Sequence, residues 1–158
     1  MRTSKELQTY INEHDLQAEI LFLTEDTPTV PDAARVLGTT VEQIIKSLVF
    51  MVSDEPILVI ANGTRKIDSR KLAAHFGVGR KRAKLAQAEM ALDITGYIVG
   101  SMPPFGHESV LPTYVDPRVM DLSLLYGGGG DVHAMMKLTS SHLLEVTQGE
   151  LLDLVEDE

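Results

Sequence analysis

The sequence predicts an α+β fold with a mixed, largely antiparallel, barrel-like sheet and surrounding helices. Three observations support this class. Short apolar runs outnumber the amphipathic helical stretches, they do not alternate regularly with helices, and turn residues often separate one run directly from the next. A length of 158 residues with 44% hydrophobic residues leaves room for one packed core. We therefore expect a single domain that spans residues 1–158.

The N-terminal third is expected to combine short helices with one strand. Leu7, Tyr10 and Ile11 share one helical face, and Ser4 precedes them as a cap. Thr40 and Gln43 have the spacing of a capping box. The expected elements are a helix at 4–14, a strand at 18–23, a turn-like connection at 24–29, a helix at 32–37 ended by Gly38, and a short helix at 41–44.

The remaining chain is expected to supply most of the sheet. Asn62-Gly63 is a strong turn signal, and Asp68 or Ser69 can cap a helix that Gly77 ends. The acidic tail, 150–158, is expected to fray at its end. The expected elements are strands at 45–52 and 57–61 joined by Ser53–Pro56, helices at 69–75 and 86–92, strands at 97–99, 110–115, 122–126 and 132–138, and a helix at 143–146 capped by Ser140 or Ser141.

Composition excludes several classes of protein. The chain has no cysteine, which excludes disulfides, thiolate metal sites and a cysteine nucleophile. Its apolar runs are too short to cross a bilayer, and residues 1–6 contain no apolar signal segment. These features together favour a cytoplasmic protein.

Basic residues are concentrated in one window, residues 65–84. This window contains eight of the 14 basic residues and only one acid, Asp68, so it has a net charge of +7 within a chain of net charge −9. Such asymmetry can attract an anionic partner such as nucleic acid, although a solvated charged helical face explains it equally well. The basic residues are Arg65, Lys66, Arg70, Lys71, Arg80, Lys81, Arg82 and Lys84.

A stiff loop, Gly100–His107, is the most informative segment. Two prolines fix the backbone and remove donors, while the glycines allow a ligand to approach the backbone closely. The loop therefore predicts a place where part of a substrate binds, and the alternative is a stiff connection without a ligand. The candidate substrate-binding residues after Gly100 are Ser101, Met102, Pro103, Pro104, Phe105, Gly106 and His107.

Lys46 is an isolated charge inside the apolar run Ile44–Phe50. Burying an ammonium is costly unless an anion or hydrogen bonds satisfy it. If its face of the strand points inward, Lys46 reaches a cavity; otherwise its ammonium extends into solvent past the strand edge.

Other chemistry is not indicated. The five histidines have no metal-ligand spacing, and no Ser-His-Asp set or Gly-x-Ser-x-Gly motif is present. His107 could act in acid–base chemistry, but a local structural role is favoured. Gly127–Gly130 lacks the lysine and context of a phosphate-binding P-loop, so it is read as a hairpin connection near a cleft, with Gly128 and Gly129 as candidate contacts.

The order of these motifs resembles the YbaK / prolyl-tRNA-synthetase-associated editing domain family. The similarity extends over roughly residues 18–146. It rests on Ile45-Lys46-Ser47-Leu48-Val49-Phe50, on Asp68-Ser69-Arg70-Lys71-Leu72, on the Gly-x-x-x-Pro element Gly100–Pro104 followed by Phe105-Gly106, and on the glycine run after Tyr126.

The resemblance implies a trans-editing deacylase that hydrolyses the ester of a mischarged tRNA, here tRNA(Pro) with a small amino acid such as Cys or Ala. It implies that Lys46 and Gly100 are the catalytic positions and that the substrate's own ribose hydroxyl helps to activate water. No metal or cofactor is implied. Val30, Leu48, Phe50 and Met102 are candidates for the pocket wall.

The resemblance also implies the partners. The 3′ end of an aminoacyl-tRNA would enter the site, the basic window would contact tRNA phosphates, and a synthetase is a further candidate partner. Two other readings remain: a non-catalytic tRNA- or nucleotide-binding module of the same fold, and a small-molecule binding domain whose basic window is only solvated surface.

Overall fold

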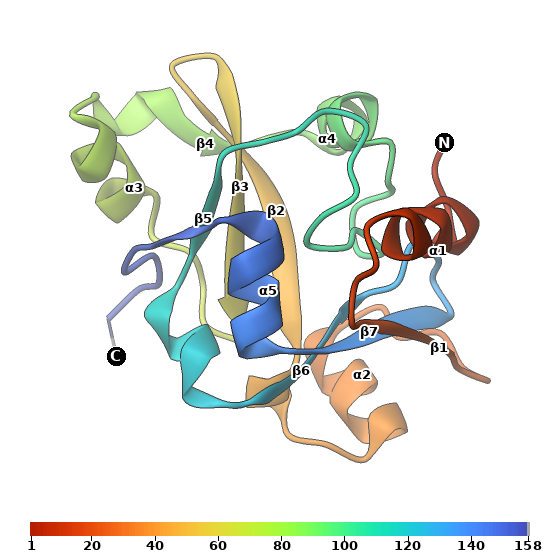
Figure 1. Cartoon of the computed structure of the whole chain (residues 1–158). Coiled ribbons are helices and arrows are strands. Elements are labelled where there is room, and N and C mark those ends of the chain that lie inside the picture. The colour runs from red at the N-terminus through yellow and green to blue at the C-terminus, as the bar shows by residue number, and fades with distance from the viewer. Residues whose placement is uncertain (158) are drawn as a thin grey trace.

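The computed structural model describes residues 1–157 and contains two sheets with helices around them (Figure 1). The smaller sheet has the order β1 (Glu19–Phe22), β7 (Ala134–Thr139), β6 (Leu124–Gly128). The larger has the order β4 (Ala83–Leu85), β2 (Ile45–Val52), β3 (Glu55–Asn62), β5 (Thr113–Val115), β8 (Glu150–Leu151). Two of the strand pairs, β3–β5 and β5–β8, are parallel and the others are antiparallel.

The α+β class with a mixed, largely antiparallel sheet is thus confirmed, but the sheet does not close into a barrel. The two sheets stay separate and meet where Ile44 bridges to Tyr126, at the start of β2 and the middle of β6. This junction matters because it brings the beginning of β2 against the glycine-rich end of β6.

Five α-helices lie around the sheets: α1 (Ser4–Glu13), α2 (Val30–Leu37), α3 (Ser69–Phe76), α4 (Ala88–Thr95) and α5 (Ser140–Thr147). Three short 3₁₀ helices connect them, η1 (Val41–Gln43), η2 (Arg80–Arg82) and η3 (Pro117–Asp121). The capping box of η1 is present as predicted, and Asp68 caps α3. Two caps lie one residue or more earlier than predicted, at Thr3 for α1 and Thr139 for α5. No helix within residues 1–157 is both long and apolar enough to cross a membrane.

The β2–β3 hairpin is the centre of the larger sheet. Its eight residue pairs run from Ile45–Asn62 to Val52–Glu55, so the connection is only Ser53-Asp54 and not the four residues expected. Both turn residues adopt positive φ, 48° and 69°, which matches the twist of a two-residue hairpin. Register places Lys46 opposite Ala61, close to the sheet junction.

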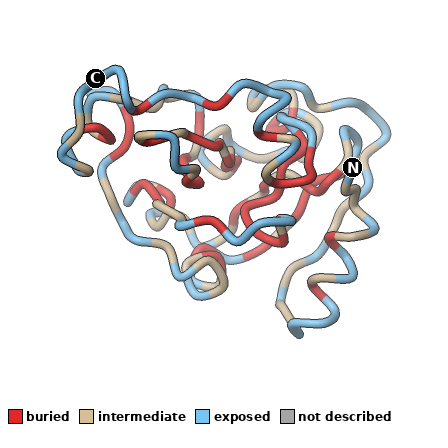
Figure 2. The backbone as a smooth tube through the Cα atoms, turned by 90° about the horizontal axis from the view of Figure 1, so that it is seen from above, coloured by how far each residue is buried: buried red, intermediate tan, exposed pale blue. Residues whose placement is uncertain are grey.

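Two apolar clusters fill the space around this hairpin. The main one joins Val49, Leu58 and Ile60 to side chains from α1, α4, α5 and the smaller sheet. A second lies between the larger sheet and α3 and includes Val59, Leu72 and Leu154. Figure 2 shows buried stretches through the middle of the molecule and exposed stretches at the outer turns.

The predicted strand at 97–99 is wrong. Gly96 ends α4 with φ 85°, and the chain turns at once, with the Ser101 N–H donating to the Ile98 carbonyl at 3.1 Å. The run is apolar because Tyr97 is a fully buried anchor, while Ile98 and Val99 are largely exposed. The predicted strand at 110–115 is shorter for a related reason, since Val110 is solvent-exposed and pairing begins at Thr113.

The segment around residue 84 also differs from the prediction. Residues 83–85 form the edge strand β4, paired with Phe50–Val52, and the following helix begins at Ala88 and not at Ala86. Lys84 and Leu85 are exposed on this edge, so the segment lacks the alternation that would have indicated a strand.

The tail does not fray over its described part. β8 pairs with β5, Ile67 bridges to Val155, and Leu154 and Val155 are almost completely buried. The acidic composition suggested a solvated tail, but the apolar residues interspersed with the acids pack against the sheet and α3.

Candidate functional site

A pocket of about 160 Å³ lies at the junction between the two sheets. It forms where the start of β2 meets the N-terminus of α2, the turn after α4 and the end of β6. Lys46 is the only charged residue among those that line it. The lining residues are Thr27, Pro28, Thr29, Val30, Ala33, Ile44, Ile45, Lys46, Ser47, Leu48, Val99, Gly100, Met102 and Gly128.

Lys46 reaches the pocket because it alternates with buried neighbours along β2. Ile45 and Ser47 are buried, whereas Lys46 and Leu48 are half-buried and point to the opposite face of the strand. The Lys46 ammonium donates one hydrogen bond, to the Arg65 carbonyl at 2.6 Å, and makes no ion pair within residues 1–157. Desolvation by burial lowers the pKa of Lys46. An ammonium has three donors, so this one has capacity for an anionic or carbonyl oxygen of a ligand.

The loop after α4 meets β6 at close range beside Lys46. Gly100 has φ 96° and is exposed at the pocket rim. Ser101 is buried, and its carbonyl accepts from the Gly130 N–H at 2.9 Å. A Cβ at Gly128 would overlap the Met102 carbonyl, so only glycine permits this approach of the loop to β6.

The structure thus brings four of the predicted positions, Lys46, Gly100, Met102 and Gly128, to one pocket. Gly129 lies just beyond it, paired through its N–H with the Ala134 carbonyl at 3.1 Å. Among residues 24–29, which the sequence reading treated as a turn, Thr27, Pro28 and Thr29 line the pocket as well. The only sequence signal for them was the Thr-Pro-Thr pattern before a helix start.

The second half of the predicted loop faces elsewhere. Pro104, Phe105, Gly106 and His107 line a separate hollow of about 90 Å³ beside Tyr10, and Pro103 is buried between the two sites. His107 Nε2 lies 2.7 Å from the Pro103 carbonyl. Burial lowers the pKa of His107, which favours the neutral ring. This half of the loop is therefore buried or half-buried outside the pocket, and its contacts are those of a structural segment.

The predicted pocket wall is largely present, with one exception. Val30, Leu48 and Met102 line the pocket. Phe50 does not; it lies further along β2 and lines a neighbouring open hollow of about 430 Å³. That hollow shares Lys46 and Leu48 with the pocket and includes Lys66 and Lys84 but no acidic residue.

The basic window divides into two groups of side chains. Arg65 and Lys71 contact the C-terminal tail: the Arg65 guanidinium donates to the Glu156 carbonyl at 2.6 Å, and the Lys71 ammonium pairs with Asp153 and Asp157 at 3.0 and 2.8 Å. The other six residues are exposed and make no ion pair within residues 1–157: Lys66, Arg70, Arg80, Lys81, Arg82 and Lys84.

Residues 1–157 contain no group of three or more His, Asp or Glu side chains placed to hold a metal ion. The chemistry available in the pocket therefore consists of the Lys46 ammonium, the hydroxyls of Thr27, Thr29 and Ser47, and backbone groups of the loop.

Comparison with known proteins gives the class to which this site belongs. The model of the aminoacyl-tRNA editing domain family matches residues 24–146, which include every residue that lines the pocket. The chain belongs to this family.

Individual relatives agree with the family. The uncharacterized protein YwhH of Bacillus subtilis (strain 168) is 26% identical over 97% of this chain and 97% of its own length. The proline–tRNA ligase of Staphylococcus aureus (strain Newman) is 29% identical over 80% of this chain, which corresponds to only 20% of the ligase. A solved structure of a protein proposed as a trans-editing enzyme for prolyl tRNA synthetase aligns with a TM-score of 0.90 at 28% identity, over 98% of this chain and 97% of that one.

Proposed function

We propose that this chain is a trans-editing aminoacyl-tRNA deacylase, which hydrolyses the ester between a wrong amino acid and the terminal adenosine of a tRNA. The observation that supports this most directly is the pocket itself. It presents the Lys46 ammonium, which makes no ion pair within residues 1–157, beside the Gly100 loop, in a chain of the editing-domain family. The same features make the 3′ end of an aminoacyl-tRNA the proposed ligand.

The proposed reaction needs few groups. Water attacks the ester carbonyl carbon, the bond from that carbon to the ribose oxygen breaks, and the ribose oxygen receives a proton, which leaves free amino acid and uncharged tRNA. Negative charge develops on the former carbonyl oxygen, and the proposed groups that stabilise it are the Lys46 ammonium and N–H groups of the loop. No carboxylate or imidazole of residues 1–157 lines the pocket, so the neighbouring ribose hydroxyl is the proposed group that positions the water.

Lys46 has a second proposed role that the same pocket supports. It could hold the terminal phosphate and act by positioning the ester, not by stabilising the oxyanion. The two roles predict different losses in a Lys46 variant. A phosphate contact contributes to binding of the ground state, so its loss raises KM, whereas an oxyanion contact acts only in the transition state, so its loss lowers kcat.

The pocket size favours a small amino acid. A cavity of about 150 Å³ accommodates benzene, so the 160 Å³ here sets an upper limit of about that size, and the side chains of alanine and cysteine lie well within it. Val30, Leu48 and Met102 give it an apolar wall. The similarity to part of a proline–tRNA ligase makes tRNA(Pro) the proposed carrier, although one methylene group changes selectivity only by about 1–3 kcal/mol.

The exposed basic side chains are the proposed tRNA surface. Lys66 and Lys84 line the open hollow that continues from the pocket at Lys46, and this hollow has no acidic residue to repel a phosphate. Such contacts position the tRNA backbone without reading its sequence. Arg70, Arg80, Lys81 and Arg82 would extend this surface.

The test is release of labelled amino acid from tRNA(Pro) charged with alanine, cysteine or proline, with Lys46→Ala in parallel. We expect selective hydrolysis of one mischarged species and a kcat reduced about a hundredfold or more in the variant. Lys46→Arg retains charge but has a different shape, and serves as the matched control. Binding of tRNA without hydrolysis of any species would favour the non-catalytic module of the same fold.

A further inference from the structure

The segment that contains the hydrogen-bond partner of Lys46 pairs with the C-terminal tail. Residues 63–68 connect β3 to α3, and within this connection Ile67 forms an antiparallel bridge with Val155. The Glu156 N–H donates to the Lys66 carbonyl at 2.8 Å, and the Asp68 N–H donates to the Leu154 carbonyl at 2.7 Å.

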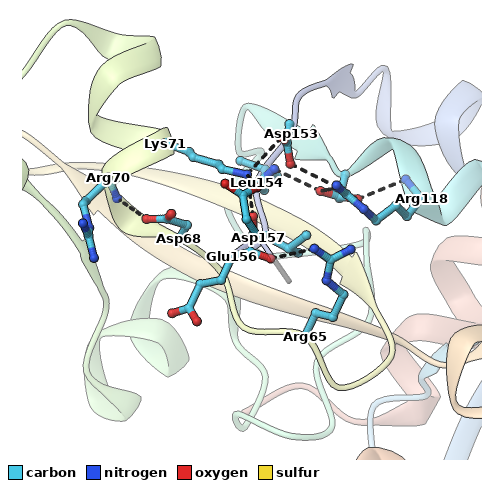
Figure 3. A network of polar contacts seen from close by, with 11 residues as sticks. Arg65, Asp68, Arg70, Lys71, Arg118, Asp153, Leu154, Glu156 and Asp157 are labelled. Carbon is cyan, nitrogen blue, oxygen red and sulfur yellow. Dashed lines mark hydrogen bonds and ion pairs between the residues drawn. The ribbon is translucent and has the colours of Figure 1, made fainter.

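Side chains strengthen this pairing from the α3 side (Figure 3). Lys71 donates to the Val155 carbonyl at 2.7 Å as well as to the carboxylates of Asp153 and Asp157. Arg65 donates to the Glu156 carbonyl. One lysine and one arginine of the basic window therefore hold the tail, and we call these contacts with residues 152–157 the tail clasp.

A third segment fixes the tail from the opposite side. Asp116, whose side chain is fully buried, accepts from the Leu154 N–H at 2.9 Å and from the Arg118 guanidinium at 3.0 Å. Arg118 also reaches Asp153 at 3.1 Å. Leu154 is fully buried in the cluster under α3, so the tail is anchored by apolar packing as well as by polar contacts.

This anchoring reaches the pocket through a single carbonyl. The Lys46 ammonium donates to the Arg65 carbonyl, and residue 65 lies at the edge of the segment that the tail holds. We propose that the tail clasp is a positioning element for Lys46: it fixes the Arg65 peptide, which in turn holds the ammonium toward the pocket. The inference rests on the proposed function, since it assigns a catalytic consequence to this contact.

The physical reason is the length of the lysine side chain. An ammonium on a four-carbon stem has many rotamers, and a fixed acceptor selects among them before substrate arrives. A misplacement of about 1 Å at a reacting group can reduce the rate about a hundredfold. The proposal therefore predicts an effect on kcat without a comparable effect on tRNA binding.

Glu156 offers a matched pair of variants. Glu156→Pro removes the N–H that donates to the Lys66 carbonyl, while Glu156→Ala keeps this N–H and removes only an exposed carboxylate that points away from the clasp in Figure 3. A chain that ends at Val155 is the second variant, because it removes the same N–H but retains the buried Leu154 and Val155.

Two readouts test the proposal. In single-turnover and steady-state deacylation, we expect Glu156→Pro and the shortened chain to lose about 10- to 100-fold in kcat with KM changed less than about twofold, and Glu156→Ala to behave as wild type. In ¹⁵N-detected lysine ammonium NMR, the hydrogen-bonded Lys46 signal should be observable in wild type and Glu156→Ala but broadened in Glu156→Pro.

The outcomes separate this inference from the proposed function. An active wild type with equal kcat in both Glu156 variants, each folded by near-UV circular dichroism, would overturn the tail clasp as a positioning element. A rise in KM alone with an unchanged Lys46 ammonium signal would also overturn it, because it would indicate a contact between the tail and tRNA. If wild type hydrolyses no charged tRNA, the proposed function fails, and the NMR signal still reports whether the clasp orders Lys46.

Discussion

The two halves of the basic window show how differently a run of positive charge can be used. In the first half, residues 65–71, Arg65 and Lys71 bind carbonyls and carboxylates of the C-terminal tail, whereas Lys66 and Arg70 stay exposed without an ion pair within residues 1–157. In the second half, Arg80–Lys84 has no ion pair within residues 1–157. A high density of basic residues in the sequence therefore does not by itself identify a nucleic-acid surface, because acidic residues far along the chain neutralise some of these basic side chains.

The electrostatics of the first half are those of a small network. The hydrogen bonds that Lys71 donates to Asp157 and then to Asp153 raise the pKa of Lys71, and the hydrogen bonds that Asp153 accepts from Lys71 and then from Arg118 lower the pKa of Asp153. These shifts mark mutual stabilisation of charges at an exposed site, where solvent weakens each pair. Among the described residues 1–157 the second half has no such partners, so we expect its charges to be available to a polyanion.

The largest difference should follow from neutralising the second half. Changing Arg80, Lys81, Arg82 and Lys84 to Gln should raise KM for charged tRNA at least about tenfold, because the phosphate contacts of these side chains are lost. Each lost contact should also reduce the steepness with which log affinity falls with log salt concentration by about 0.7–0.9. Deacylation measured at several salt concentrations should show this slope flattened, with kcat unchanged. Lys5→Gln, on α1, is the control and should leave both unchanged. An unaltered KM would remove this group from the tRNA surface.

A smaller effect of a different kind is expected in the first half. Lys71→Ala should lower the thermal midpoint of unfolding by a few degrees and reduce kcat, because the tail loses three contacts at once. KM for charged tRNA should change less than about twofold. Thermal unfolding and steady-state kinetics of the same preparation would check this. A variant with normal stability and a raised KM would instead indicate that Lys71 contacts tRNA, as proposed for Arg80–Lys84, and does not hold the tail.

The smallest effect concerns acid stability. The folded-state pKa of Asp153 is lowered, so its contribution to the free energy of unfolding is present above its ordinary pKa of about 3.9 and is lost as pH falls through the lower folded value. Asp153→Asn should therefore flatten the loss of stability as pH falls below about 4 in denaturant titrations. Asp93→Asn, an exposed residue of α4, is the control. Equal pH profiles for wild type and Asp153→Asn would show that the network does not stabilise the fold.

Local sequence signals predicted much of the fold and part of the site. The capping box at Thr40, the cap at Asp68 and the strand at 45–52 depend on neighbours within a few residues, and all three are present. The same kind of signal failed at Tyr97–Val99, because an apolar run that anchors a turn has the composition of a strand. Lys46 was found because an isolated charge in an apolar strand is unusual whatever the fold.

The sequence by itself determined where most of the longer strands and helices form, which lysine lies among apolar neighbours, and that Gly38 and Gly77 end helices. These follow from side-chain period and backbone preference, which act over a few residues. Only the tertiary structure decided that Gly100 lines the pocket while His107 lines a separate hollow, and that the tail binds Lys71 across 82 to 86 positions of chain. Such contacts depend on which distant segments the sheet brings together, and no local pattern encodes that choice.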